Sequence, residues 1–161
     1  MSEDPSIRRF APHVAKTSDR SEPLVWSVDT RHLPLYWFPR DCPRACFWPG
    51  EHTSADDAAL LQGSMQVHAA ETVWFERMRS ARVVAYRLPE EPFEHEGDGF
   101  WVSRDPVEPI ELVELGDLLE LHAEALIELR FLPSIWPLWR QVASSTLEYS
   151  GIRLRNAQPA K

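Results

Sequence analysis

The stretch from Leu24 to Pro49 constrains the fold most, because it combines bulky aromatic residues with proline at short intervals. It contains three of the seven tryptophans, both cysteines and four of the 14 prolines. Proline cannot donate a backbone hydrogen bond, so it limits both helices and central strands. The stretch therefore predicts two short strands, at 24–29 and 45–48, separated by a segment rich in turns and aromatic residues.

The rest of the chain mixes helix and strand patterns without the regular alternation of a doubly wound sheet. Capping residues and apolar stripes predict helices at 53–61, 71–79, 117–125 and 134–150. Alternating or β-branched runs predict further strands at 65–69, 82–88, 100–103, 109–115 and 127–132. The acidic segment 90–99 indicates a surface loop. We predict an α+β fold in which one mixed sheet of about five to seven strands is flanked by helices.

The length of 161 residues fits a single domain with a sizeable core. We expect one domain over 1–161, with a partly flexible N-terminal segment at 1–22 and a flexible tail at 157–161. Within that N-terminal segment, Phe10 is expected to dock on the core, and Lys16 to Glu22 to form an exposed loop. The net charge of −8 argues against nucleic acid or an anionic membrane as a partner.

The sequence shows neither a secretory signal pattern nor a run of about 18 apolar residues. We therefore expect a cytoplasmic protein. Association of the chain with copies of itself is left open. Trp26, in the middle of a predicted strand, and Trp139, on the apolar stripe of the last predicted helix, are expected to be buried core anchors.

Cys42 and Cys46 are too few for the disulfide framework of a small secreted protein, and we expect them to stay reduced and unlinked. Their favoured interpretation is that of small buried hydrophobic residues. A nucleophilic Cys42 is the alternative, because neighbouring cations such as Arg40 and Arg44 would favour its thiolate.

No metal or cofactor is predicted. Zinc could be bound by the two cysteines with His32 and His52, but their spacing matches no standard ligand pair. The chain contains no GxGxxG, no phosphate loop and no GxSxG elbow. Without any of these three motifs, the sequence leaves open whether the protein is an enzyme.

The candidate site combines arginines with aromatic residues. Arg40, Asp41 and Arg44 follow the run Tyr36-Trp37-Phe38, and a second arginine-rich segment, 153–156, follows the last predicted helix. Arginine for charge and aromatics for stacking suit an anionic ligand. The structural alternatives are an Arg–Asp pair that holds a turn, and a tail that caps helix carbonyls. The predicted ligand-binding residues are Tyr36, Trp37, Arg40, Asp41, Cys42, Arg44, Arg153, Arg155 and Asn156.

The two halves of this predicted site are far apart in the sequence but share an excess of arginine. A buried ion pair is costly unless further hydrogen bonds compensate. We therefore expect the side chains of Arg40 and Asp41 to pair with groups from the C-terminal segment. Such a meeting would either lock the tail or form a clamp for a ligand.

Two motifs, YWFPRDCPR at 36–44 and SGIRLRNA at 150–157, resemble a family of uncharacterised bacterial proteins of unknown function. The segment WVSRDPVEP at 101–109 fits the same family, so the resemblance covers nearly the whole chain. In that family a strand ending in a His-Phe-Ser-type segment precedes the equivalent of Glu3-Asp4-Pro5, and this chain starts at Met1-Ser2 without it. The resemblance implies no activity.

The complete family pattern is also similar to the ADP-ribosyltransferase-like fold, which binds NAD in a cleft between two small sheets. This similarity would make Ser27 the polar residue of the second strand and NAD an alternative cofactor. Three functions therefore compete. The first is binding of an anionic small molecule, with nucleotides as one class. The second is a structural or protein-interaction module without catalytic activity. The third is a degenerate ADP-ribosyltransferase-like enzyme.

Overall fold

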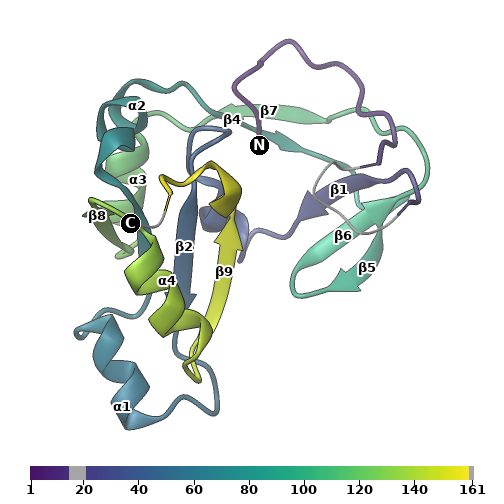
Figure 1. Cartoon of the computed structure of the whole chain (residues 1–161). Helices are drawn as coiled ribbons and strands as arrows, with labels where there is room; N and C mark the ends of the chain where they lie inside the picture. The colour runs from purple at the N-terminus through teal and green to yellow at the C-terminus, as the bar shows by residue number, and fades with distance from the viewer. Residues whose placement is uncertain (15–20, 160–161) are drawn as a thin grey trace. The chain divides into compact units, whose positions relative to one another are not determined.

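The computed structural model describes residues 1–14 and 21–159, and the chain divides into two compact units (Figure 1). Unit 1 comprises residues 1–36 and 83–115, and unit 2 comprises residues 37–82 and 116–161. The α+β class is confirmed. The nine strands found in the described residues form sheets of three, four and two strands, in place of one sheet of five to seven. The expectation of a single domain over 1–161 stays a prediction.

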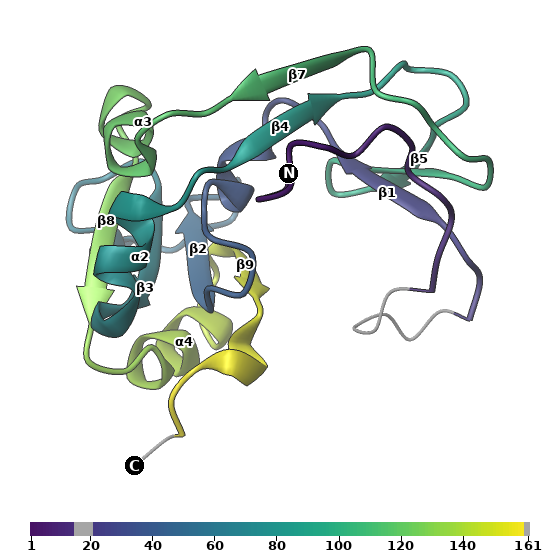
Figure 2. The same ribbon diagram turned by 90° about the horizontal axis from the view of Figure 1, so that it is seen from above.

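Unit 1 contains the two smaller sheets. Strands β1 (Val25–Val28), β6 (Phe100–Ser103) and β5 (Glu94–Gly97) form an antiparallel sheet in the order β1-β6-β5. Strands β4 (Val84–Arg87) and β7 (Glu111–Glu114) form an antiparallel ribbon, which Figure 2 shows side by side. A short 3-10 helix, η1 (Leu33–Tyr36), follows β1.

Strand β5 lies where an acidic surface loop was expected, and this part of the prediction is wrong. The strand pairs antiparallel with β6, with Glu94 opposite Val102 and a shift of register between His95 and Gly97. Asp98 and Gly99 connect the two strands with φ angles of 48° and 75°. An Asp-Gly pair is the strongest short-range hairpin signal, because it tolerates positive φ at both positions. The strand was not predicted because the residues of β5 are acidic and exposed and lack the alternating hydrophobic residues that usually flank such a turn.

The N-terminal segment is attached to unit 1 by isolated bridges. Main-chain hydrogen bonds join Ser2 to Val84 and Phe10 to Val107. The Phe10 ring meets Tyr86 edge to face at 5.2 Å, which confirms the expected docking of Phe10. The exposed loop expected at 16–22 lies mostly outside the described residues.

Unit 2 is built on a four-stranded mixed sheet in the order β8-β3-β2-β9. The strands are β2 (Arg44–Trp48), β3 (Val67–Glu71), β8 (Glu128–Leu132) and β9 (Glu148–Ile152). Only the β3–β8 pair is parallel. The central strands are almost fully buried, and Phe47 and Val67 lie in an apolar cluster completed by Leu61, Val142 and Leu147. Burial on both faces explains the absence of polar alternation in β2 and β3.

Two helices of unit 2 begin after residues that the sequence marks as caps, Ser54 and Asp117, whereas the expected cap Ser134 lies one residue before the observed N-cap, Ile135. Helix α1 (Ala55–Ala58) continues into η2 (Ala59–Leu61), and the Ser54 side chain accepts a hydrogen bond from Asp57 N. Helix α2 (Phe75–Ser80) follows η3 (Thr72–Trp74). The Asp117 carboxylate caps α3 (Leu118–Glu124), and α4 spans Trp136–Ala143. No helix in the described ranges is both long and apolar enough to cross a membrane.

The last helix is shorter than predicted, because α4 ends at Ala143 and β9 occupies 148–152. The Ser144 hydroxyl donates to Arg140 O at 2.9 Å and the Ser145 hydroxyl to Val142 O at 2.7 Å. Hydroxyls that bond back to the last helix carbonyls end a helix readily. Tyr149 then lies opposite Phe47 in the sheet, a contact that the helical pattern did not indicate.

Trp26 and Trp139, which the sequence predicts to be core anchors, are half-buried and lie outside the set of buried core residues. Each instead makes an edge-to-face contact. Trp26 meets Phe100 at 6.1 Å in unit 1, and Trp139 meets Tyr149 at 5.5 Å in unit 2.

Candidate functional site

Unit 1 contains a pocket of about 230 Å³ with mostly aromatic walls. Strands β1, β4 and β6, the η1 helix and the N-terminal segment all contribute to it. Aromatic rings come from Phe10, Trp26, Tyr36, Tyr86 and Phe100. The remaining lining residues are Met1, Ser27, Val28, Leu33, Ala85 and Leu88.

The aromatic walls of this pocket are fixed by contacts between their own members. Phe10 and Tyr86 meet at an interplanar angle of 77°, and Trp26 and Phe100 at 82°. Such edge-to-face pairs stabilise beyond the area that they bury. The Tyr86 hydroxyl donates to Asp4 O at 2.7 Å and accepts from Ile7 N at 3.1 Å, so its hydrogen bonds are committed to the N-terminal segment.

Ser27 brings an uncommitted hydroxyl to the same pocket. It lies in β1 opposite Trp101 and is half-buried. Its side chain has no hydrogen-bond partner among residues 1–14 and 21–159. A pocket with apolar walls and a few polar groups is the usual form of a small-molecule site. Ser27 is thus a group that could orient a ligand there.

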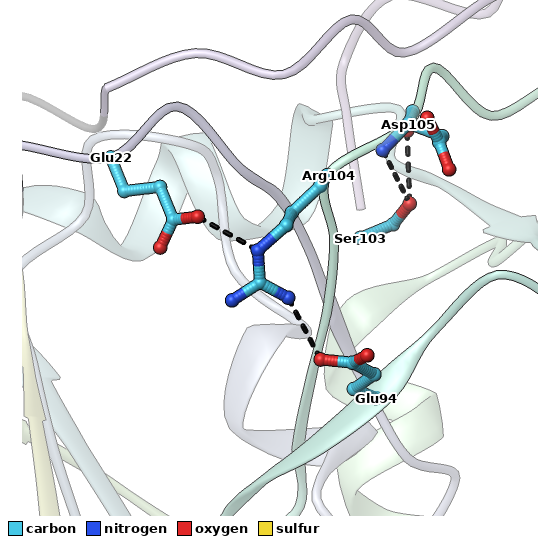
Figure 3. A network of polar contacts seen from close by, with 5 residues as sticks. All are labelled: Glu22, Glu94, Ser103, Arg104 and Asp105. Carbon is cyan, nitrogen blue, oxygen red and sulfur yellow. Dashed lines mark hydrogen bonds and ion pairs between the residues drawn. The ribbon is translucent and has the colours of Figure 1, made fainter.

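The charged cluster in the 101–109 motif is structural. Figure 3 shows Arg104 between Glu22 and Glu94, with hydrogen bonds of 2.8 Å to each. The Ser103 hydroxyl donates to Asp105 O at 2.9 Å and accepts from Asp105 N at 3.0 Å, which closes the turn after β6. Both ion pairs are exposed, and exposed pairs contribute little to stability or to ligand affinity.

The predicted aromatic wall 36–38 is divided between the two units. Tyr36 lines the unit 1 pocket, whereas Trp37 and Phe38 belong to unit 2. The Trp37 ring meets His122 edge to face at 5.6 Å, and its indole N–H is buried without a hydrogen-bond partner in the described chain. Phe38 is buried against the same histidine.

Arg44 is buried within unit 2, with only 3% of its surface exposed. Its Nη1 donates to Cys42 O at 3.0 Å, and its guanidinium carbon lies 5.1 Å from the centre of the Phe38 ring. A hydrogen-bonded guanidinium over an aromatic face is a stabilising arrangement. Arg40 and Asp41, by contrast, have exposed side chains.

Both cysteines are free and buried. Burial raises the pKa of the Cys42 thiol to about 12, and the nearby Arg44 offsets only part of that effect. Burial likewise raises the pKa of Cys46 to about 12. A thiol that stays protonated at neutral pH is a poor nucleophile. The structure therefore favours the buried, inert interpretation over a nucleophilic Cys42.

A buried histidine pair lies beside these residues, and the sequence pointed to only one of its members. His68 Nδ1 lies 3.0 Å from His122 Nε2, and His122 Nδ1 lies 2.6 Å from Leu118 O. Gln66 Nε2 lies 2.9 Å from His68 Nε2. Because the Leu118 carbonyl can only accept, His122 donates to it from Nδ1 and accepts from His68 Nδ1 at its own Nε2. Both rings therefore complete these hydrogen bonds as neutral imidazoles with the proton on Nδ1. His68 is thus a satisfied interior residue.

Desolvation shifts the protonation of both rings. Burial, followed by the charges of His122 and Arg44, lowers the pKa of His68 well below its ordinary value. Burial also lowers the pKa of His122, although its bond to Leu118 O opposes the shift. The two rings are therefore neutral at pH 7 and hold the interior of unit 2 together.

The C-terminal residues of the predicted site do meet the Arg40–Asp41 turn. Asn156, in η4 (Leu154–Asn156), donates from Nδ2 to Asp41 O at 2.8 Å. The contact uses the main-chain carbonyl of Asp41, and not the side chains of Arg40 and Asp41 as expected. The side chains of Arg153 and Arg155 form no hydrogen bond or ion pair with the described residues. The ligand-binding role of the nine predicted residues stays a prediction.

Within residues 1–14 and 21–159, no three histidine, cysteine or acidic side chains are placed to hold a metal ion together. The chain belongs to a family of unknown function, DUF6886, whose model matches residues 1–157. Comparison with curated proteins and with solved structures found no match.

Proposed function

We propose that the protein binds a small molecule carrying a planar ring in the unit 1 pocket, with nucleotides as the first class to test. One observation carries the proposal. Five aromatic rings and the uncommitted Ser27 hydroxyl converge on one cavity. Aromatic walls favour a flat ligand through stacking and edge contacts. A hydroxyl among them gives the ligand an orientation.

The size of the pocket limits what it holds. Its volume of about 230 Å³ lies below the 300–1,000 Å³ that is typical of sites for drug-sized ligands. It suits a ring system of one or two fused rings. In a nucleotide, the base would occupy the pocket, and the sugar and phosphate would extend beyond it.

The anionic character of the ligand rests on the sequence alone. None of the predicted arginines lines this pocket, and Arg44 already bonds within unit 2. A comparison of adenosine with AMP separates the two parts of the proposal, because the molecules share the base and differ in the phosphate. NAD belongs in the same series as the probe for an ADP-ribosyltransferase-like site.

The test is a thermal-shift titration of the full chain with adenosine, AMP, NAD and inorganic phosphate. A ligand at 100 times its dissociation constant stabilises the folded protein by about 2.7 kcal/mol. Ala85→Phe fills the pocket and is expected to abolish the stabilisation, whereas Ala123→Phe, on the exposed face of α3, should preserve it. A stabilisation that survives Ala85→Phe unchanged would place the ligand elsewhere and contradict the proposal.

A second candidate is a protein-interaction module, and β7 supplies the observation that favours it. All four of its residues are exposed, including Leu112 at 38% and Val113 at 42%, and Ile110 before it is exposed at 59%. Aliphatic residues on both faces of a two-stranded ribbon are costly to leave in water. Light scattering over a concentration series tests association with a second copy. Leu112→Lys should then shift the protein toward the monomer.

A further inference from the structure

Asp29 and His32 form a hydrogen-bonded pair directly after β1. Asp29 Oδ1 accepts from the main-chain N–H of His32 at 2.8 Å and lies 2.8 Å from Nδ1 of its ring. The sequence Asp-Thr-Arg-His favours this turn, because an aspartate side chain readily accepts a hydrogen bond from a backbone N–H a few residues further along the chain. One carboxylate oxygen thus fixes both the backbone and the ring of His32.

The β5–β6 hairpin holds the His32 ring from the other side. A Cβ built on Gly99 would lie 2.0 Å from His32 Nδ1, so only glycine leaves space for the ring. The φ of 75° at Gly99 also favours glycine. Asp29 N donates to Gly99 O at 2.9 Å, which joins the two turns. The orientation of His32 is therefore set by Asp29 on one side and by Gly99 on the other.

The hydrogen bond to Asp29 determines which nitrogen of His32 carries the proton. Partial burial alone would raise the pKa of Asp29, but hydrogen bonds from the His32 backbone and ring outweigh it and lower that pKa. Asp29 is therefore an acceptor, and Nδ1 is the donor. In neutral His32 this leaves a lone pair on Nε2, which has no partner in the described residues, and the side chain is 23% exposed.

The pair is flanked in the sequence by residues that line the aromatic pocket. Val28, which precedes Asp29, and Leu33, which follows His32, both line the pocket. Phe100, next to the Gly99 that supports the ring, lines it too. Adjacent residues are only about 3.8 Å apart at Cα, so the main chain of the pair adjoins the pocket wall.

We propose that His32 determines the ligand specificity of this pocket: its Nε2 accepts a hydrogen bond from an N–H or O–H group on the edge of the ligand ring. Asp29 is the positioning residue that holds the accepting tautomer. This inference rests on the proposed function. It names the ligand class more closely, as a planar ring with a protic edge. A purely structural pair would cap η1 through the His32 backbone and would not distinguish ligands.

The test uses indole and benzofuran, two rings of nearly the same shape, of which only indole has an N–H group. Wild-type protein is expected to bind indole roughly three- to tenfold more tightly, which is the usual value of one hydrogen bond. His32→Leu should equalise the two dissociation constants. His52→Leu is the matched control and should preserve the preference, because His52 is an exposed residue of unit 2 that does not line the pocket.

A measurement on the wild-type chain keeps the test independent of the variants. Nitrogen-15 spectra of labelled histidine should show His32 with its proton on Nδ1. The Nε2 resonance should move with indole and stay in place with benzofuran. Equal binding of both rings to the wild-type protein, or a preference that His32→Leu retains, overturns the role of His32 while the pocket stands. If neither ring binds, the pocket proposal fails and this inference fails with it.

Discussion

The side-chain amide of Asn156 donates a hydrogen bond of 2.8 Å to the main-chain carbonyl of Asp41, across 115 positions of the sequence. Two further contacts hold the residues that follow. Gln158 N donates to the buried carboxylate of Glu71 at 3.0 Å, and Trp136 Nε1 donates to Gln158 O at 2.7 Å. These bonds support a lock on the C-terminal tail over a ligand clamp. The lock uses Glu71 and not the exposed Arg40.

Glu71→Gln should loosen this tail. Glu71 has no exposed surface, and its Oε1 also accepts from Ile135 N at 3.4 Å, at the start of α4. In the variant, the side-chain NH2 group would replace one carboxylate oxygen of Glu71 and would face the backbone N–H of Ile135 or Gln158. Two donors cannot form a hydrogen bond with each other. Leaving buried groups unpaired costs about 1–3 kcal/mol. We expect a loss of that size in urea unfolding and faster exchange of the Gln158 amide proton.

Two variants calibrate this result. Glu76→Gln changes an exposed carboxylate in α2 and should stay within about 0.5 kcal/mol of wild type. Arg40→Ala should also stay within about 0.5 kcal/mol, because its side chain is exposed. If Arg40→Ala destabilised the protein and freed the tail as much as Glu71→Gln, the lock would have to involve the arginine.

The buried pair His68 and His122 should make the protein acid-sensitive. The pKa of each ring is lowered in the folded state, so the unfolded chain takes up protons first as the pH falls. Stability is therefore fully present above about pH 6.5, the ordinary histidine value, and declines below it. Each ring that stays neutral contributes a slope of up to about 1.4 kcal/mol per pH unit. Arg44 faces His68 and adds to its resistance to protonation.

Urea unfolding at pH 7.5, 6.5 and 5.5 measures this slope. Nitrogen-15 spectra of the histidine rings over the same range report which of them stay neutral. Protonation of His68 near pH 6.5 in the folded protein would contradict the assignment. A stability that is flat down to pH 5.5 would do the same.

Local sequence signals correctly predicted the parts of the fold that local chemistry decides. Strands β1 and β2 and the caps Ser54 and Asp117 lie where the side-chain patterns placed them. The error at β9 has a non-local cause. Strand β9 forms because Tyr149 and its neighbours pair with β2, about 100 residues earlier in the chain. A helical spacing of apolar residues carries no information about that partner.

The candidate site was only partly predictable for the same reason. The run 36–38 reads as one aromatic wall, yet Tyr36 lines a pocket in unit 1 and Phe38 packs on histidines in unit 2. The other pocket rings come from segments as distant as Phe10 and Phe100. Their convergence depends on sheet pairing, which the sequence of each segment does not reveal. The Asp-Thr-Arg-His turn was a local signal that could have identified His32.

Gly151 in β9 should be intolerant of a side chain although it makes no tight turn. A Cβ there would lie 2.5 Å from the Trp139 ring and 2.8 Å from Leu154 Cδ1. Trp139 is held in place by its edge-to-face contact with Tyr149. Crowding a packed ring typically costs about 1–3 kcal/mol. Gly151→Ala should therefore destabilise the protein by that amount in chemical denaturation.

Gly50→Ala is the matched control for Gly151. Its Cβ would also come close to a neighbour, at 2.7 Å from Glu148 Cγ. That neighbour is the flexible side chain of an exposed residue, which can rotate away. We expect a change within about 0.5 kcal/mol. Equal losses for both variants would show that Trp139 does not fix the position of β9.

Cys42 and Cys46 should resist thiol reagents until the protein unfolds. The thiolate is the reacting form, and a pKa of about 12 for each residue leaves about one thiol in 10,000 ionised at pH 8. Burial also blocks access of the reagent, since both residues have no exposed surface. Native protein treated with a disulfide reagent at pH 8 should label slowly, at a rate that follows the opening of unit 2. Two equivalents should react at once in denaturant, which also confirms that the cysteines are unlinked. Rapid labelling of one cysteine in the native protein would restore the nucleophilic interpretation of Cys42.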